Sequence, residues 1–127
     1  MGFRIVTEQT ADFLHVSLSG TSATEDDFLT SGRRVASLAS ARGCSRVLID
    51  ERQTDSTVTP HARMRIIDEL WRELNESRVQ RIACVSTARA GSLASVEQLA
   101  QQRGIDYRFF KAPEEAAAWL KDEEAGD

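Results

Sequence analysis

The sequence predicts an α/β fold in which an N-terminal antiparallel hairpin is followed by parallel strands, in the order β-β-α-β-α-β-α-β-α. Two runs with strand-like alternation, residues 3–9 and 13–20, are separated by only three residues. A gap this short cannot hold a crossover helix, so these strands are expected to be antiparallel neighbours. The later strand-like runs are separated by helical patterns, which predicts parallel strands with helices packed on the sheet.

The hairpin is followed by a helix with clear signals at both ends. Thr24 and Asp27 are spaced like an N-cap residue and its partner in a capping box. Apolar residues then recur at helical spacing until Gly43, a natural residue just beyond a helix end. This helix is amphipathic, which indicates that it packs on the sheet with one face.

The next strand, "RVLID" over residues 46–50, carries three consecutive apolar residues, as expected of a strand that is covered on both faces. A polar loop follows, and Pro60 then stands where a first helical residue would be, in a helix that runs to about Ser77. The remaining predicted elements are a buried strand over 81–86, a helix over 92–104 capped by Ser92 and ended by Gly104, a strand over 107–110 and a helix from Pro113 to 120.

Length and composition indicate one globular domain. The chain has 127 residues, of which 41% are hydrophobic and 28% charged, and this length is sufficient to bury a core without disulfides or metals. We assign residues 1–121 to a single domain and residues 122–127 to an acidic tail that is expected to fray.

Charge and cysteine content bound the partners and the compartment. The formal net charge is −4 and the arginines are scattered, so a nucleic-acid partner is not expected. Two cysteines give no disulfide framework, which suits a reducing compartment. The first residues alternate like a strand, and no apolar run has the length of a signal segment or a membrane span. These features predict a cytoplasmic protein.

The order of elements and several strand-end patterns resemble a known family. The hairpin ending in "LSG", the capped helix, "RVLID", "RIACVS" and the closing "YRFFKAPEEAAAWL" are similar to the STAS-like group related to SpoIIAA-type anti-sigma-factor antagonists. Within that group the chain resembles the small bacterial SpoIIAA-like or STAS/SEC14-type proteins. The resemblance covers roughly residues 3–121. It implies a βα-superhelix fold, and a role in protein–protein regulation or ligand binding that involves no catalysis.

The antagonist branch of this group implies a phosphorylation site. There, a serine in an Asp-Ser-Ser-Gly motif opens the helix after the third strand and is phosphorylated by a partner kinase. The matching region here reads "TDSTVT", in which Asp55, Ser56 and Thr57 match the first three positions in kind and Val58 replaces the glycine. The resemblance therefore implies a phospho-switched antagonist that uses Ser56 or Thr57, as an alternative to a binding module without a switch.

The candidate binding site is the polar loop over residues 52–63. It follows a parallel strand and precedes a helix N-terminus, where open α/β sheets bind ligands and where the helix dipole favours an anion. The second strand-end loop, residues 86–92, is expected beside it. The alternative is purely structural, because turn and capping residues of these types occur in any such loop. The candidate ligand- or partner-binding residues are Arg52, Asp55, Ser56, Thr57, Thr59, His61 and Arg63.

No catalytic or metal-binding constellation is visible in the sequence. His15 and His61 are the only histidines, and neither has a second ligand at metal-binding spacing. No serine has one glycine two positions before it and another two positions after it, as the nucleophile elbow requires. Asp50 ends a strand as in a receiver domain, but the initial hairpin lacks the acidic pair that a receiver requires. We therefore expect Asp50 to end the strand and either cap it or pair with a neighbouring arginine. The sequence predicts a protein that is not an enzyme and needs no cofactor or metal.

The tryptophans and the hairpin leave further binding modes open. Trp71 and Trp119 are expected in the core, and the alternative is that their two helices enclose a small apolar or lipid ligand that the protein carries or senses. Phe13, His15 and Ser17 on the wetter side of the hairpin form a second candidate contact surface. The predicted function is thus a non-enzymatic regulatory or binding module with a protein partner or a small anionic or apolar ligand, and a homodimer stays open.

Overall fold

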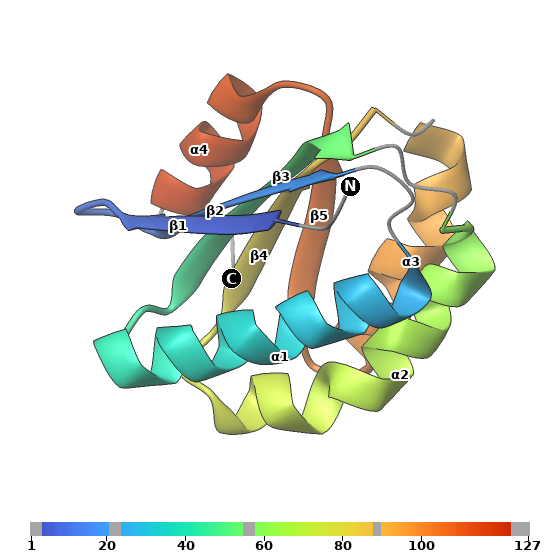
Figure 1. Cartoon of the computed structure of the whole chain (residues 1–127), viewed down its shortest axis with the longest axis horizontal. Helices are drawn as coiled ribbons and strands as arrows, with labels where there is room; N and C mark the ends of the chain where they lie inside the picture. Colours follow the sequence, from blue (N-terminus) through green and yellow to red (C-terminus); the bar gives the residue numbers. More distant parts are fainter. Residues whose placement is uncertain (1–3, 21–23, 55–57, 88–89, 123–127) are drawn as a thin grey trace.

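The predicted order of elements is confirmed in the computed structural model of the chain, which describes residues 4–20, 24–54, 58–87 and 90–122 (Figure 1). The elements are β1 (Arg4–Gln9), β2 (Leu14–Gly20), α1 (Glu25–Arg42), β3 (Arg46–Thr54), α2 (Pro60–Glu76), β4 (Arg81–Val85), α3 (Ala90–Gln102), β5 (Asp106–Phe110) and α4 (Pro113–Lys121). The predicted tail 122–127 lies, apart from Asp122, outside the described residues, so the domain boundary stays a prediction.

The five strands form one mixed sheet in the order β1-β2-β3-β4-β5. β1 and β2 are antiparallel, and β2 to β5 are parallel to one another. This arrangement confirms the predicted hairpin and the predicted parallel strands. Each strand pairs with its neighbour in the sequence, so the sheet grows in one direction from β1 at one edge to β5 at the other.

Helices cover the two faces of the sheet unequally. α1, α2 and α3 pack on one face, and α4 packs on the other, against β3, β4 and β5 (Figure 1). The three crossovers run in the same direction across the sheet, and right-handed crossovers then place their helices on the same face. α4 follows the last strand, makes no crossover, and covers the opposite face.

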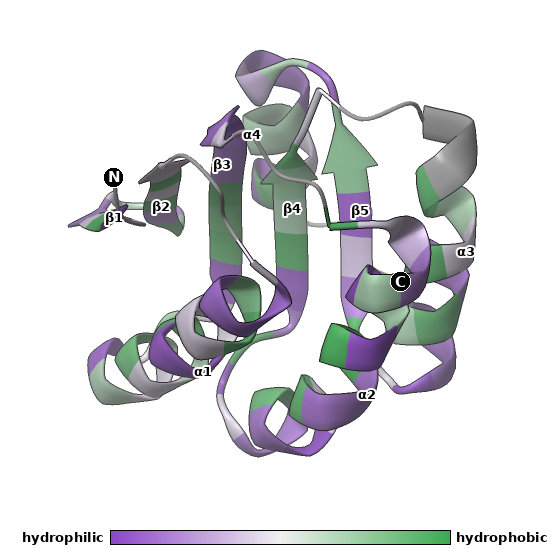
Figure 2. Ribbon diagram, turned by 45° about the vertical axis from the view of Figure 1, so that its right-hand side comes forward, coloured by the Kyte–Doolittle hydropathy of each residue, from purple (hydrophilic) through white to green (hydrophobic). Residues whose placement is uncertain are grey.

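The core has one part on each side of the central strands. The larger part includes Leu14, Val16, Val47 and Ile82 beneath α1 to α3. The smaller includes Leu48, Ala83 and Val85 of the sheet and Leu120 of α4. The central strands are therefore buried on both faces, as their consecutive apolar residues predict, and Figure 2 shows the apolar colour concentrated in the middle of β3 and β4.

The predicted ends of α1 are confirmed in detail. The Thr24 hydroxyl accepts a hydrogen bond from the Asp27 N–H at 3.1 Å, and the Asp27 carboxylate accepts one from the Thr24 N–H at 2.8 Å. This is the reciprocal pair of a capping box. Gly43 follows the helix with φ of 67°, a left-handed conformation that glycine adopts without strain.

Two predicted boundaries are wrong. β3 continues to Thr54, four residues beyond Asp50, because β2 is long enough to pair with it as far as Gly20 opposite Thr54. Glu51 to Thr54 are thus strand residues and not part of a loop. α3 begins at Ala90, so Ser92 lies inside the first turn and is not the cap; alanine is the strongest helix former and extends the helix backwards.

Candidate functional site at the carboxyl edge of the sheet

The candidate site lies at the edge of the sheet where the parallel strands end and the helices begin. In Figure 2 the arrowheads of β3, β4 and β5 point to this edge. Helices α2, α3 and α4 each begin after one of these strand ends, so helix N-termini gather there. Of the candidate residues, Asp55, Ser56 and Thr57 lie outside the described residues; Arg52, Thr59, His61 and Arg63 are described.

Arg52 is held at the surface by Asp50, the residue at which the sequence predicted the end of this strand. Its Nη2 atom lies 2.7 Å from Oδ2 of Asp50, and its Nε and backbone N–H both donate to Oδ1 at 2.9 and 3.1 Å. The side chain of Arg52 is 37% exposed. Hydrogen bonds from Arg52 hold the pKa of Asp50 below its ordinary value. The expectation that Asp50 pairs with a neighbouring arginine is confirmed.

Thr59 is the N-cap of α2. Its hydroxyl accepts a hydrogen bond from the Ala62 N–H at 3.1 Å, and Pro60 occupies the first turn. Thr59 and His61 are both exposed at this end of the helix. The first turn of α2 holds no acidic side chain, whereas those of α1 and α4 do. The capping role expected of this loop therefore applies to Thr59, and the exposed His61 remains available to a partner.

Arg63 lies in the interior and not on the exposed surface of the predicted binding segment. Its Nη2 atom donates to Oε1 of Glu51 at 2.5 Å, and its Nη1 donates to Oε2 at 3.3 Å. The two side chains are only 10% and 4% exposed. The guanidinium carbon also lies 5.7 Å from the ring centre of Phe28 and 5.6 Å from that of Phe109. Arg63 thus connects the start of α2 to the end of β3 through its ion pair with Glu51, and its guanidinium also contacts two aromatic rings.

Glu51 is not among the binding residues predicted from the sequence, although the sequence carries a signal for its burial. Glu51 follows Ile49 with strand spacing, which places both side chains on one face of β3. Arg63 precedes Ile67, Leu70 and Leu74 at helical spacing, which places it on the buried face of α2. An acid and an arginine on two facing apolar surfaces indicate a buried ion pair.

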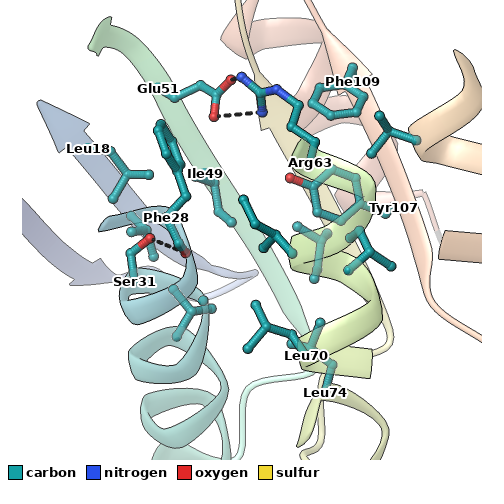
Figure 3. Close-up of a pocket in the computed structure, with 17 residues that line it drawn as sticks. Leu18, Phe28, Ser31, Ile49, Glu51, Arg63, Leu70, Leu74, Tyr107 and Phe109 are labelled. Atoms are coloured by element: carbon teal, nitrogen blue, oxygen red, sulfur yellow. Dashed lines mark hydrogen bonds and ion pairs between the residues drawn. The ribbon is translucent and has the colours of Figure 1, made fainter. Parts of the chain in front are cut away.

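An apolar cavity of about 70 Å³ lies beneath this ion pair. Figure 3 shows the Glu51–Arg63 pair at one end of the cavity and Leu70 and Leu74 toward the other, with α1 and α2 on its sides. The sheet supplies its floor through residues such as Ile49. The lining is therefore mostly hydrocarbon, with the hydroxyl-bearing Ser31 and Tyr107 among it and the charged groups at one end.

Cys84 is buried near the ion pair, and Tyr107 is partly buried there. Burial raises the pKa of the Cys84 thiol and of the Tyr107 phenol well above their ordinary values. The thiolate is the nucleophilic form of cysteine, so a thiol with a raised pKa is unreactive. Cys84 packs as a small hydrophobic residue, as its position in an apolar strand predicts.

The apolar site predicted between the tryptophan-bearing helices is wrong. Trp71 on α2 packs against the core beneath α1 to α3, and Trp119 on α4 belongs to the core on the other face of the sheet. The sheet separates the two side chains, so they cannot line one pocket. The reason lies in the topology, because α4 is the one helix that makes no crossover.

Metal-ligand clusters and membrane-spanning helices are both absent from the described residues. In the part of the chain that the structure describes, no group of three or more His, Cys, Asp or Glu side chains is arranged to hold a metal ion. None of the described helices is long and apolar enough to cross a membrane.

In the second strand-end loop, Ser86 is buried and its N–H donates to the Phe110 carbonyl at 3.0 Å, so the described start of that loop is tied to β5.

Comparisons with known proteins identify the fold. No protein-family model and no curated protein matches the chain. An anti-sigma factor antagonist from Mycobacterium paratuberculosis superposes with a TM-score of 0.58 and 13% identity, over 95% of this chain and 96% of that chain. An uncharacterized protein of the DUF3478 family with a SpoIIAA-like fold, from Shewanella loihica PV-4, superposes with a TM-score of 0.53 and 18% identity, over 94% of each chain.

Proposed function

From the SpoIIAA-like fold of this chain, we propose that it is a STAS-like regulatory module that acts in the cytoplasm by binding another protein, and not by catalysis. The observation that carries the proposal is the full-length likeness to an anti-sigma factor antagonist. Fold alone does not fix function, so the proposal also rests on the exposed polar groups at the carboxyl edge of the sheet.

The partner-binding surface in this proposal is the segment 52–63, which runs from the end of β3 into the start of α2. Two of its side chains are held in place before a partner arrives: Arg52 by Asp50, and Thr59 by its capping hydrogen bond. A surface that is already ordered loses less conformational entropy on binding. His61 stands beside Thr59 and is exposed. Arg52 is bound to Asp50 and lies near Glu114 at the start of α4, on the other side of the sheet from Glu51. The surface at the start of α2 therefore offers a hydroxyl and an imidazole to a complementary protein.

Binding can be tested with two variants at opposite ends of the same helix. His61→Glu changes the proposed surface, and Glu76→Lys changes an exposed position at the far end of α2. The unmodified chain is first used to capture a partner protein from host extract, and this partner is purified. It should bind His61→Glu at least about tenfold more weakly than the unmodified chain, and it should bind Glu76→Lys with the same affinity as the unmodified chain. Equal binding of both variants, or a loss caused by Glu76→Lys alone, would refute this surface.

A finer form of the proposal is a phospho-switch at Ser56 or Thr57. These residues precede the N-terminus of α2, whose first turn lacks acidic side chains, and a helix N-terminus favours a phosphate. Incubation with host extract and ATP should then add one phosphate, measured by intact mass. The double variant Ser56→Ala/Thr57→Ala should stay unmodified. Phosphate on neither residue would remove the switch and leave the binding module intact.

A second candidate function is the binding of a small apolar ligand, and the apolar cavity beneath the Glu51–Arg63 pair favours it. An apolar cavity of about 150 Å³ holds benzene, so 70 Å³ suits only a few carbon atoms. The occupant in this proposal is the end of an acyl chain, lying among the side chains of α1, α2 and the sheet.

Decanoate is a suitable probe for this cavity. Saturating decanoate should shift the methyl resonances of Leu70 and Val35, which line the cavity, and leave those of Leu120 on the other face unchanged. Val35→Phe fills the space and should abolish the shifts. Shifts that persist in Val35→Phe, or that spread equally to Leu120, would contradict binding in the cavity.

A further inference from the structure

The outer edge of β1 is an unpaired strand edge among the described residues. β1 pairs with β2 and ends the sheet on that side, and in Figure 2 it lies beyond β2, away from the central strands. Val6 in the middle of β1 is 53% exposed and is the one large hydrophobic side chain exposed in the described part of the chain. An edge strand offers its N–H and C=O groups to another strand unless something prevents it.

The hairpin geometry shows which residues offer these groups. The Thr10 N–H donates to the Phe13 carbonyl at 2.9 Å, so this is a hydrogen-bonded pair. Hydrogen-bonded and non-hydrogen-bonded pairs alternate along an antiparallel ladder. Every second residue before Thr10 therefore directs its backbone groups toward β2. These residues are Glu8, Val6 and Arg4. Ile5, Thr7 and Gln9 therefore direct theirs outward, to the open edge.

The same alternation fixes which side chains share a face. Ile5 packs against the core beneath α1 to α3, so Arg4, Val6 and Glu8 are on the other face of the strand. α4 on that face packs against β3, β4 and β5. Neither Arg4 nor Glu8 has an ion-pair partner among the described residues. The edge thus carries one basic, one apolar and one acidic side chain in a row.

This row is complementary to itself. Two copies of β1 can be placed antiparallel about a two-fold axis at Val6. Val6 then faces Val6, and Arg4 of each copy faces Glu8 of the other, so two ion pairs form. In this register Ile5 is opposite Thr7, and both direct their backbone groups to the open edge, so they form the hydrogen-bonded pairs. Centring the axis on Ile5 or Thr7 sets neither charge opposite its complement.

We propose that this edge binds a second copy of the chain, through antiparallel pairing of β1 with β1 about a two-fold axis at Val6. The two five-stranded sheets then form one continuous sheet of ten strands. The contact is isologous, so it closes after two copies and leaves no further edge of β1 to recruit a third. The carboxyl edge of each sheet stays open to a protein partner.

A cysteine at position 6 tests the register. Non-hydrogen-bonded partners have Cα atoms about 4.5 Å apart, within the range that a disulfide spans. Val6→Cys should therefore form a covalent dimer under mild oxidation, seen by intact mass without reductant. Thr7→Cys is the control, because its partner is Ile5 and the two cysteines lie too far apart. No dimer from Val6→Cys, or equal yields from both variants, would overturn the proposal.

Charge reversal tests the ion pairs independently. The unmodified chain should be a dimer by sedimentation equilibrium. Glu8→Arg sets arginine opposite arginine twice and should raise the dimer dissociation constant by about tenfold or more. Arg4→Glu/Glu8→Arg restores opposite charges and should restore the dimer. Circular dichroism confirms that each variant is folded. A monomeric parent chain, or a double variant no tighter than Glu8→Arg, would refute the pairing.

Discussion

Arg63 in the first turns of α2 donates a hydrogen bond of 2.5 Å to Glu51 near the end of β3, in a place where both side chains are almost fully buried. Burial removes water from two charges, and a close partner with good geometry offsets that loss. The desolvated guanidinium is further surrounded by Phe28 and Phe109. The pair therefore fixes the start of α2, and with it the candidate binding loop, to the sheet.

Breaking this pair from one side should destabilise the fold strongly. Arg63→Met leaves the Glu51 carboxylate buried without its partner, which is expected to lower the free energy of unfolding by about 3–5 kcal/mol. Glu51→Leu/Arg63→Met replaces both charges with hydrocarbon and should recover most of that loss. Urea denaturation measures both. Arg52→Met, which breaks an exposed pair, is the control and should cost less than about 1 kcal/mol. Equal costs for Arg63→Met and Arg52→Met would contradict the role of burial.

Gly32 allows α1 and α2 to approach closely. A Cβ atom at this position would clash with Cδ1 of Leu70, which is itself buried. Gly32→Ala should therefore lower the free energy of unfolding by about 1–3 kcal/mol through overpacking.

In a Leu70→Ala background the clash is gone, and Gly32→Ala should be neutral or stabilising because alanine favours helix. Urea denaturation of the four proteins completes the cycle. A cost of Gly32→Ala that is the same in both backgrounds would show that the close approach is not the cause.

Asp50 should contribute to the acid sensitivity of the fold. Hydrogen bonds from Arg52 hold its pKa in the folded protein below the ordinary value. The contribution to stability is then fully present above about pH 4, the unfolded value, and is lost as pH falls through the folded pKa. Melting temperatures between neutral and acidic pH should fall more steeply for the unmodified chain than for Asp50→Asn. Parallel curves would show that this pair makes no contribution.

Neither cysteine should react while the protein is folded. Cys44 and Cys84 are both buried, and burial raises the pKa of the Cys84 thiol. Iodoacetamide at about pH 8 should leave both unlabelled in buffer and label both in urea, as measured by intact mass. Glu76→Cys, at an exposed position, is the positive control and should be labelled at once. Labelling of Cys84 in buffer at the rate of the control would contradict its burial.

Features with local signals could be predicted from the sequence. The capping box of α1, the left-handed Gly43 and the hairpin each depend on residues close together in the chain. The buried strands β3 and β4 were visible because their apolar residues are consecutive. The pairing of Asp50 with an arginine two positions away was likewise a local matter.

Features that depend on strand order could not be predicted in this way. The separation of Trp71 from Trp119 requires knowing which helices make crossovers. The length of β3 depends on its pairing with β2, and the Glu51–Arg63 pair depends on how α2 lies over β3. Of the candidate binding residues, Thr59 carried a local capping signal, whereas the burial of Arg63 is a consequence of packing between distant segments.

The strand order has a consequence for how the chain folds as it is made. Every strand after β1 pairs with the strand that precedes it in the sequence, so no strand must wait for a partner that is synthesised later. During N-terminal to C-terminal synthesis, the hairpin can form first, and each helix–strand unit can then add to the edge that was most recently completed. Short sequence separation between paired strands also favours rapid folding. α4, which emerges after all five strands, closes the second face over β3, β4 and β5, so it completes the burial of strands that are already paired.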